Sequence, residues 1–250
     1  MNAPAGAEVT RAEVCAAACA DAWRGDGEIL ASPMGLIPTI GARLARALFE
    51  PELLLSDGEA TLVGGVWPVD EPPPPAAAEG WVPYRAIFDL VASGRRHVMM
   101  GPSQLDRYGN ANISAIIGDG DFQHPARQLL GVRGAPGNTV NHAVSYWVPR
   151  HSRRVFVEHV DMVCGVGYDR GAVDLRVVVT NLAVLDFETP EHTMRLRSVH
   201  PGVEVAEVLT ETGFDLVVPD EVAVSRVPSA AELDLIRRLD PDRARDQEVR

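Results

Sequence analysis

Apolar residues recur along the chain with two different spacings, which predict helices and strands in alternation. From residue 36 to residue 48, leucine and isoleucine recur at every fourth position, as they do on one face of a helix. Short apolar runs at 53–55 and 97–100 are bounded by turn-forming residues and are typical of buried strands. A strand, a helix and a second strand in this order form a crossover unit with parallel strands. We therefore expect an α/β fold, with an open, mostly parallel sheet and flanking helices.

Helix caps and apolar patterns predict the remaining elements. Thr10 with Glu13, and Ser229 with Glu232, fit capping boxes, which mark the first turns of two helices. In a helix over 84–93, three apolar side chains are expected to face inward: Ile87, Phe88 and Val91. Further helices are expected over 11–23, 36–49 and 205–211, and strands over 28–31, 113–117, 175–179, 183–187 and 194–199.

The domain organisation predicted from the sequence is simple. Residues 1–240 are expected to form a single domain, because no internal repeat is visible and the chain is long enough for one large core. The proline-rich stretch 68–75 suits neither a helix nor a central strand, so it is expected to run over the surface as a connector or as a flap. Residues 241–250 are expected to form a charged C-terminal tail that frays.

The apolar run at 53–55 stops at two carboxylates, Asp57 and Glu59, with Gly58 between them. In open α/β sheets, ligands bind near the ends of strands, so these carboxylates are candidate catalytic groups. The alternative is a polar turn that only closes a strand, because aspartate and glycine are common turn formers.

Composition excludes several functional classes. The chain of 250 residues has a formal net charge of -12, whereas a nucleic-acid groove needs a basic face. Its N-terminus lacks the basic and apolar regions of a signal peptide, and no apolar run is long enough to span a bilayer. We therefore expect a cytoplasmic protein that binds neither nucleic acid nor membrane.

The reactive residue types narrow the chemistry further. The chain has no lysine, which excludes Schiff-base chemistry and the phosphate-binding P-loop, and it has no Gly-x-Ser-x-Gly nucleophile motif. Cys15 and Cys19 would share one helix face and are predicted to be core thiols, and the histidines show no metal-binding spacing. Carboxylate chemistry without a metal is the main candidate that this leaves.

The run from residue 101 to residue 112 carries polar residues at spaced positions, around a hairpin-like turn at Gly109-Asn110. It resembles the G-x-x-Q-x-D-x-x-G-N-x-N run of class I coenzyme A transferases, specifically of their β subunits. The matching residues are Gly101, Gln104, Asp106, Gly109, Asn110 and Asn112.

This resemblance implies the fold of that family and a catalytic role at residue 57. In class I coenzyme A transferases, a strand delivers a glutamate that attacks the thioester, and Asp57 stands at the matching position. Aspartate is one methylene shorter, and a displacement of about 1 Å can cost on the order of a hundredfold in rate. Glu59 is not a simple substitute, because two residues along a strand move a side chain by roughly 6 to 7 Å.

The resemblance also implies a substrate-binding segment. Residues 133–138 fall where the family has a glycine-rich loop whose backbone amides stabilise a thioester oxyanion, although Pro136 lacks one such amide. Without the resemblance, a tight turn is equally compatible. His142 could act as a general acid or base, or only hydrogen-bond a neighbour. The residues predicted to bind substrate are Gly134, Ala135, Gly137, Asn138, Asn141 and His142.

Residues 131–167 resemble one branch of the family, the β subunits of steroid-ring-opening CoA hydrolases, which likewise carry Ser-Asp-Gly-Glu in place of the transferase glutamate. This likeness implies retro-Claisen C–C hydrolysis of a CoA thioester, with an α subunit of the same family as partner in an αβ or α2β2 assembly. CoA would arrive on the substrate, so no separate cofactor is expected. The alternatives are a true CoA transferase β subunit, with Asp57 as nucleophile, and a non-catalytic structural subunit.

Overall fold

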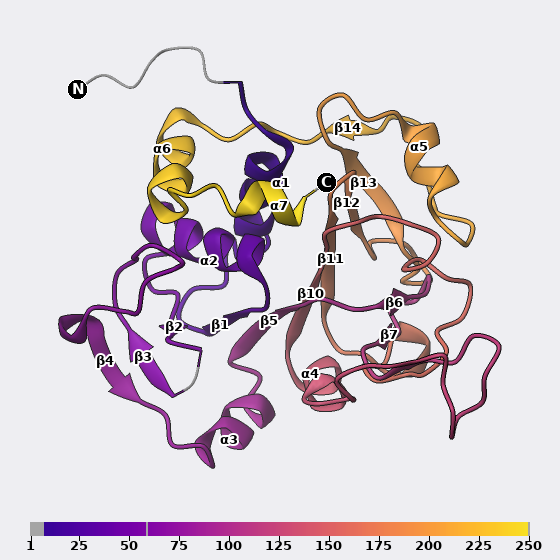
Figure 1. Cartoon of the computed structure of the whole chain (residues 1–250), viewed down its shortest axis with the longest axis horizontal. Helices are drawn as coiled ribbons and strands as arrows, with labels where there is room; N and C mark the ends of the chain where they lie inside the picture. The colour runs from indigo at the N-terminus through magenta and orange to yellow at the C-terminus, as the bar shows by residue number, and fades with distance from the viewer. Residues whose placement is uncertain (1–7, 59, 250) are drawn as a thin grey trace.

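The computed structural model describes residues 8–58 and 60–249, and a seven-stranded sheet runs through this part of the chain (Figure 1). The strand order is β1-β5-β10-β11-β12-β13-β14. Four strands pair in parallel: β1 (Leu30–Pro33), β5 (Arg96–Met100), β10 (Ala143–Val148) and β11 (Leu175–Thr180). The strands β12 (Ala183–Asp186) and β13 (Arg195–Val199) add antiparallel pairs, and β14 (Ala223–Val224) pairs in parallel with β13. The predicted open, mostly parallel α/β sheet is confirmed.

One layer of helices covers the β1 end of this sheet (Figure 1). It consists of α1 (Arg11–Asp21), α2 (Leu36–Leu48) and α6 (Ala230–Leu239), and both predicted capping boxes are present at Thr10 and Ser229. Small residues let α1 and α2 approach closely, because a Cβ atom at Gly41 would lie only 2.8 Å from the Cβ atom of Cys19. Cys15 and Cys19 are fully buried in this layer, as predicted for core thiols.

The chain leaves the main sheet soon after α2. Leu54 forms a single parallel bridge to Leu30, and the following residues pair in a separate three-stranded sheet (Figure 1). That sheet contains β2 (Leu55–Ser56), β3 (Thr61–Val63) and β4 (Ala78–Trp81), with a short 3-10 helix η1 (Pro75–Ala77) before β4. Leu54 therefore shows the parallel pairing that was predicted for this crossover unit. The strand expected over 53–55 does not continue in the main sheet.

Shorter elements complete the fold around β5. The predicted turn at Gly109-Asn110 joins β6 (Gln104–Leu105) to β7 (Ala111–Asn112), which pair as a hairpin. The strand expected over 113–117 is reduced to β8 (Ala115–Ile116), paired with β9 (Arg127–Gln128). The helical elements are α3 (Ala86–Ala92), α4 (Ala135–Asn141), η2 (Tyr168–Arg170), α5 (Val205–Thr210) and α7 (Arg245–Glu248). Within the described ranges, no helix is long and apolar enough to cross a bilayer.

The prediction that three apolar side chains of α3 face inward is wrong for Phe88. The Phe88 side chain is 62% exposed, and Ile87 and Val91 are only half-buried. The apolar pattern of this helix finds too little neighbouring surface in the chain to cover it, since α3 lies at the lower edge of the molecule (Figure 1).

The C-terminal segment does not fray as expected, because its charges are paired inside the fold. Arg245 is 2% exposed, and its guanidinium lies 3.1 Å from Glu13 and 2.9 Å from Asp240. Glu248 accepts a hydrogen bond of 2.6 Å from the indole N–H of Trp147. These contacts dock α7 against α1 and the sheet, so the two ends of the chain stabilise one another.

Replacing Arg245 by alanine should lower the free energy of unfolding by about 3 kcal/mol, because the change leaves Glu13 and Asp240 buried without this cation. Urea unfolding at neutral pH measures the effect. The matched control is R238A in α6, whose ion pair with Asp234 is exposed and should contribute about 0.5 kcal/mol or less. Equal losses in the two variants would contradict the structural role of the docked C-terminus.

Candidate functional site

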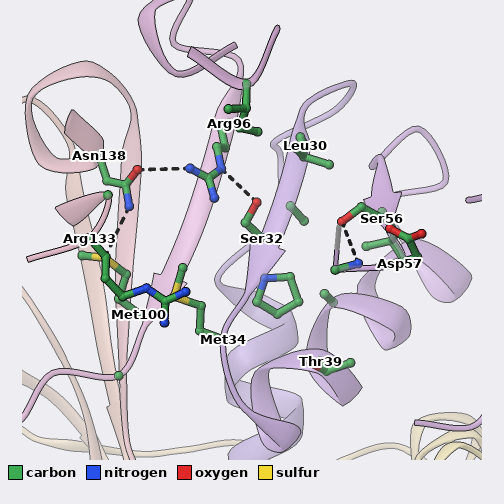
Figure 2. Close-up of a pocket in the computed structure, with 18 of the residues that line it drawn as sticks. Leu30, Ser32, Met34, Thr39, Ser56, Asp57, Arg96, Met100, Arg133 and Asn138 are labelled. Carbon is green, nitrogen blue, oxygen red and sulfur yellow. Dashed lines mark hydrogen bonds between the residues drawn. The ribbon is translucent and has the colours of Figure 1, made fainter. Parts of the chain in front are cut away.

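A cavity of about 1430 Å³ lies along β1 and β5, between the start of α4 and the turn that follows β2 (Figure 2). Part of its wall is apolar and includes Leu30, Met34, Leu55, Leu62, Met100 and Ile113. Its polar and charged lining residues include Ser32, Thr39, Arg43, Ser56, Asp57, Arg96, Ser103, Gln128, Arg133 and Asn138. A cavity of this size and mixed lining suits a ligand with a large apolar body and a few polar groups.

The alternation of side chains along β5 decides which of its residues reach the cavity. Successive side chains of a strand point to opposite faces, so Arg96 and Met100 face the cavity whereas His97 and Met99 face α1 and α2. Arg96 Nε donates to Ser32 Oγ at 2.9 Å, and its Nη1 donates to Asn138 Oδ1 at 3.1 Å (Figure 2). Partial burial lowers the pKa of the Arg96 guanidinium below its ordinary value. The sequence prediction did not include Arg96.

His97 belongs to a buried polar network on the opposite face of β5. Its Nδ1 lies 2.8 Å from Asp26 Oδ2 and its Nε2 lies 2.9 Å from Ser145 Oγ, while Arg176 forms an ion pair with Asp26. Burial lowers the pKa of His97 although the carboxylate of Asp26 opposes this shift. Serine, histidine and aspartate occur here in the order of a hydrolase triad, but His97 and Ser145 are fully buried and do not line the cavity. The network therefore joins β5, β10 and β11 to the loop that follows α1.

Asp57 lies at the rim of the cavity, in the turn between β2 and β3 (Figure 2). Its Oδ1 accepts a hydrogen bond of 3.1 Å from the Thr61 amide, and its own amide donates to the Thr61 carbonyl. Gly58 follows with a φ of +92°, a conformation that favours glycine. Asp57 is thus an exposed turn residue at the rim of the cavity, and its carboxylate accepts a hydrogen bond within the turn. Glu59, the second predicted catalytic residue, lies outside the described residues.

The segment predicted as a glycine-rich loop is instead the first turn of α4. Gly134 is the N-cap and Pro136 stands in the first turn, where its missing N–H costs no helical hydrogen bond. The Ala135 and Asn138 amides already donate to Val132 and Gly134 carbonyls, so they are not a free pair of oxyanion donors. The segment is therefore helical and not a loop, and a substrate-binding role for its amides stays a prediction. The Asn138 side chain is a polar group that this turn presents to the cavity.

The six predicted substrate-binding residues separate into two groups. Three of them line the cavity: Gly134, Ala135 and Asn138. The cavity lining does not include Gly137, Asn141 and His142. The side-chain amide of Asn141 donates to the Gly137 carbonyl at 2.7 Å. His142 is buried behind Asn138, with its Nε2 3.2 Å from Asn138 Oδ1, and burial lowers its pKa to about 4. His142 is placed to position Asn138 and not to meet a ligand directly.

The described charges around the cavity are mostly positive, although the whole chain is acidic. Three arginines line it, Arg43, Arg96 and Arg133, against one described carboxylate, Asp57. Arg43 donates to the Trp67 carbonyl and stacks on its indole, and burial lowers its pKa to about 10. The described residues contain no cluster of histidine, cysteine and carboxylate side chains that could hold a metal ion.

A model of the coenzyme A transferase family matches residues 85–211, which include β5, α4 and most of the central sheet. The chain is also 52% identical to the cholesterol ring-cleaving hydrolase IpdB subunit of Rhodococcus jostii (strain RHA1), with 97% of each chain covered. The chain belongs to the coenzyme A transferase family.

Two further relatives agree with this assignment. The chain is 49% identical to the cholesterol ring-cleaving hydrolase IpdB subunit of Mycobacterium tuberculosis (strain H37Rv), over 96% of this chain and 99% of that one. The crystal structure of Rhodococcus jostii RHA1 IpdAB superposes with a TM-score of 0.91 at 52% identity and covers 98% of this chain and 100% of the matched chain. The class I coenzyme A transferase fold expected from the motif is therefore confirmed.

In this coenzyme A transferase chain, the motif over 101–112 is mainly scaffold. Asp106 accepts backbone hydrogen bonds from Tyr108 and Asn110, and burial raises its pKa. Asn112 donates to Gln104 Oε1 at 2.7 Å across the β6–β7 hairpin. Of the residues that match the motif, only Gly101 lines the cavity. These polar residues are therefore needed for the hairpin that flanks β5 and not for contact with a ligand.

The stability of the protein should fall between about pH 6.5 and pH 4, in part through His142. Its pKa is about 4 in the folded chain and about 6.5 when unfolded, so the unfolded chain binds the extra proton in this window. H142Q should reduce the slope of unfolding free energy against pH by up to one proton, or about 1.4 kcal/mol per pH unit. Urea unfolding at pH 7, 5.5 and 4.5 measures the slope.

The control is H124Q, which removes a histidine from the surface instead of a buried one. If H142Q leaves the slope unchanged, His142 is protonated to the same extent in both states and its assigned environment is wrong.

Proposed function

We propose that this chain is the β subunit of a heteromeric hydrolase that opens a carbon ring of a steroid-derived CoA thioester. The observation that carries the proposal is the full-length identity of 52% with a subunit named as a cholesterol ring-cleaving hydrolase. An α subunit of the same family would complete the enzyme, as an αβ or α2β2 assembly. The cavity supports this assembly, because Asp57 is exposed at its rim, where a second subunit could close over it.

The proposed reaction is a retro-Claisen hydrolysis. Water adds to a ring ketone, the adjacent C–C bond breaks, one fragment becomes a carboxylate, and the carbanion on the other carbon takes up a proton. One water is consumed and CoA stays attached. A base poised near the working pH and a donor to the developing oxyanion would supply the main catalytic contributions.

Within this reaction, Asp57 orients or activates water at the rim of the cavity, and Glu59 is proposed, from the sequence alone, to assist it. The main base then belongs either to Asp57 or to the α subunit. Asn138 holds a substrate oxygen: among the described residues, its side-chain N–H has only the weak acceptor Met100 Sδ at 3.5 Å, so it remains able to donate. His142 positions this amide from behind.

The second candidate is a true CoA transferase β subunit in which Asp57 is the nucleophile. The family description and the place of Asp57 beside the cavity favour it. It would form an acyl-enzyme on this chain and show ping-pong kinetics. A third candidate, a structural subunit that only completes the α subunit, predicts that no cavity residue of this chain matters for turnover.

No resident cofactor is part of the proposal, because CoA arrives on the substrate. A cytoplasmic location is proposed as well. It is supported by three buried cysteines without disulfides, which suit a reducing compartment.

Co-expression of this chain with its α subunit, followed by incubation with a ring-bearing steroid-derived acyl-CoA in oxygen-18 water, tests the function. Mass spectrometry should show one added water, the label in a new carboxylate, and CoA still attached. A parallel reaction contains a free-acid acceptor. Transfer of CoA to that acceptor would refute the hydrolase and establish the transferase.

Replacing Asp57 by asparagine should reduce ring opening by about a hundredfold or more in the assembled enzyme, because the charge is lost while an oxygen remains to accept from Thr61. The matched control is D121N, in an exposed turn away from the cavity, where aspartate accepts the Gln123 and His124 amides. Turnover that is unchanged in D57N would favour the structural subunit or a base on the α chain.

A further inference from the structure

We propose that Glu248, in the last helix, is a positioning residue for the part of the cavity wall that Met34 and Thr39 form. Its carboxylate caps the start of α2 and so fixes the segment from which these two side chains reach the cavity. The inference goes beyond the proposed function, because it concerns how the far end of the chain shapes the cavity. It makes the C-terminal helix α7 a determinant of ligand affinity.

Helix α2 begins without a side-chain cap of its own. Its N-cap residue is Gly35, which has no side chain to accept from the first amides of the helix. Glu248, 211 residues after Ile37, supplies the acceptor: its Oε2 accepts from the Ile37 amide at 3.2 Å. A carboxylate at this end of a helix also interacts favourably with the helix dipole. The cap of α2 therefore comes from the opposite end of the sequence.

The second carboxylate oxygen of Glu248 ties the same point to the central sheet. Its Oε1 accepts from the indole N–H of Trp147, a buried residue of β10, at 2.6 Å. Gly35 lies against both side chains: its φ is +114°, and a Cβ there would lie 3.4 Å from Glu248 Oε1 and 3.6 Å from Trp147 Cδ1. Glycine at this position thus permits the carboxylate to approach closely. One side chain consequently joins the start of α2 to β10.

The segment that Glu248 holds forms one wall of the cavity (Figure 2). Met34 directly precedes Gly35, and Thr39 lies in the first turns of α2. The hydroxyl and the amide of Thr39 both donate to the Gly35 carbonyl, at 2.7 and 3.1 Å. Met34 and Thr39 line the cavity, whereas Glu248 is not among its lining residues. Glu248 therefore acts through residues 34–39 and not by contact with a ligand.

Helix α7 is anchored independently of this contact. Arg245 pairs with Glu13 and Asp240, and Val249 packs against the core beneath α1 and α2. Helix α7 also contacts both α1 and α2. Removing the Glu248 carboxylate should therefore loosen the start of α2 while α7 stays docked.

Hydrogen–deuterium exchange of the assembled αβ enzyme, measured by mass spectrometry, tests the local effect without a ligand. E248A should raise exchange about fivefold or more in peptides that cover residues 34–40, because the cap of α2 is lost, and should leave residues 175–199 unchanged. E248Q keeps one acceptor oxygen and should show a smaller rise. The matched control is Q247A, an exposed residue of the same helix, which should exchange as wild type does.

Ligand affinity tests the consequence for the cavity. The probe is a ring-bearing steroid-derived acyl-CoA, and calorimetry measures its dissociation constant well below the unfolding temperature. E248A should weaken binding at least about fivefold, the lower end of typical coupling between two sites, and Q247A should not change it. R195A controls for stability, because it leaves buried Asp186 without this arginine at the other end of the sheet and does not touch α2. R195A should bind the probe as wild type does.

Three results would overturn the inference: exchange over 34–40 that is unchanged in E248A, an affinity that is unchanged in E248A, or a loss of affinity that R195A shares. Failure of the proposed function gives a different result. A wild type that neither binds nor opens the probe would refute the proposed substrate. A rise in exchange confined to residues 34–40 in E248A would then still retain Glu248 as the residue that positions this wall.

Discussion

Strand β5 separates two environments, and the alternation of its side chains decides what each environment receives. On one face, His97 is anchored to Asp26 in the loop after α1 and to Ser145 of β10. On the other face, Arg96 and Met100 line the cavity. A shift of one residue would place the Arg96 guanidinium under the helices and remove it from Ser32 and Asn138. The buried network of His97 thus fixes the register on which the cavity depends.

This arrangement explains which parts of the fold could be predicted. Elements with strong local signals were found: α2 from its four-residue apolar spacing, α1 and α6 from their capping boxes, and β5 from its apolar run. The errors concern residues whose environment is set by distant parts of the chain. Arg245 finds Glu13 at a separation of 232 residues, and no local pattern could reveal that pair. Residues 134–138 were predicted to form a loop because they contain glycines and a proline. Proline is also suited to the first turn of a helix, and the segment begins α4.

The candidate site likewise contains residues that the sequence could predict and residues that it could not. Asp57 and Asn138 were within reach of the sequence because a family pattern pointed to them, although the structure places them on a hairpin turn and a helix. Arg96 could not be predicted as a site residue, because its contacts form only when β1, β5 and α4 come together. The motif that indicated the family consists mainly of buried hydrogen-bonding residues around the β6–β7 hairpin. Family recognition and ligand contact therefore depend largely on different residues in this chain.

The pairing of Glu13 with Arg237 and Arg245 affects the order in which parts of the protein fold during synthesis. The two arginines follow Glu13 by 224 and 232 residues, so the buried carboxylate of helix α1 is paired only after α6 and α7 have been synthesised. Until then, α1 cannot complete its packing, even where the central strands have already associated. The helical layer over β1 consequently closes later than the central strands.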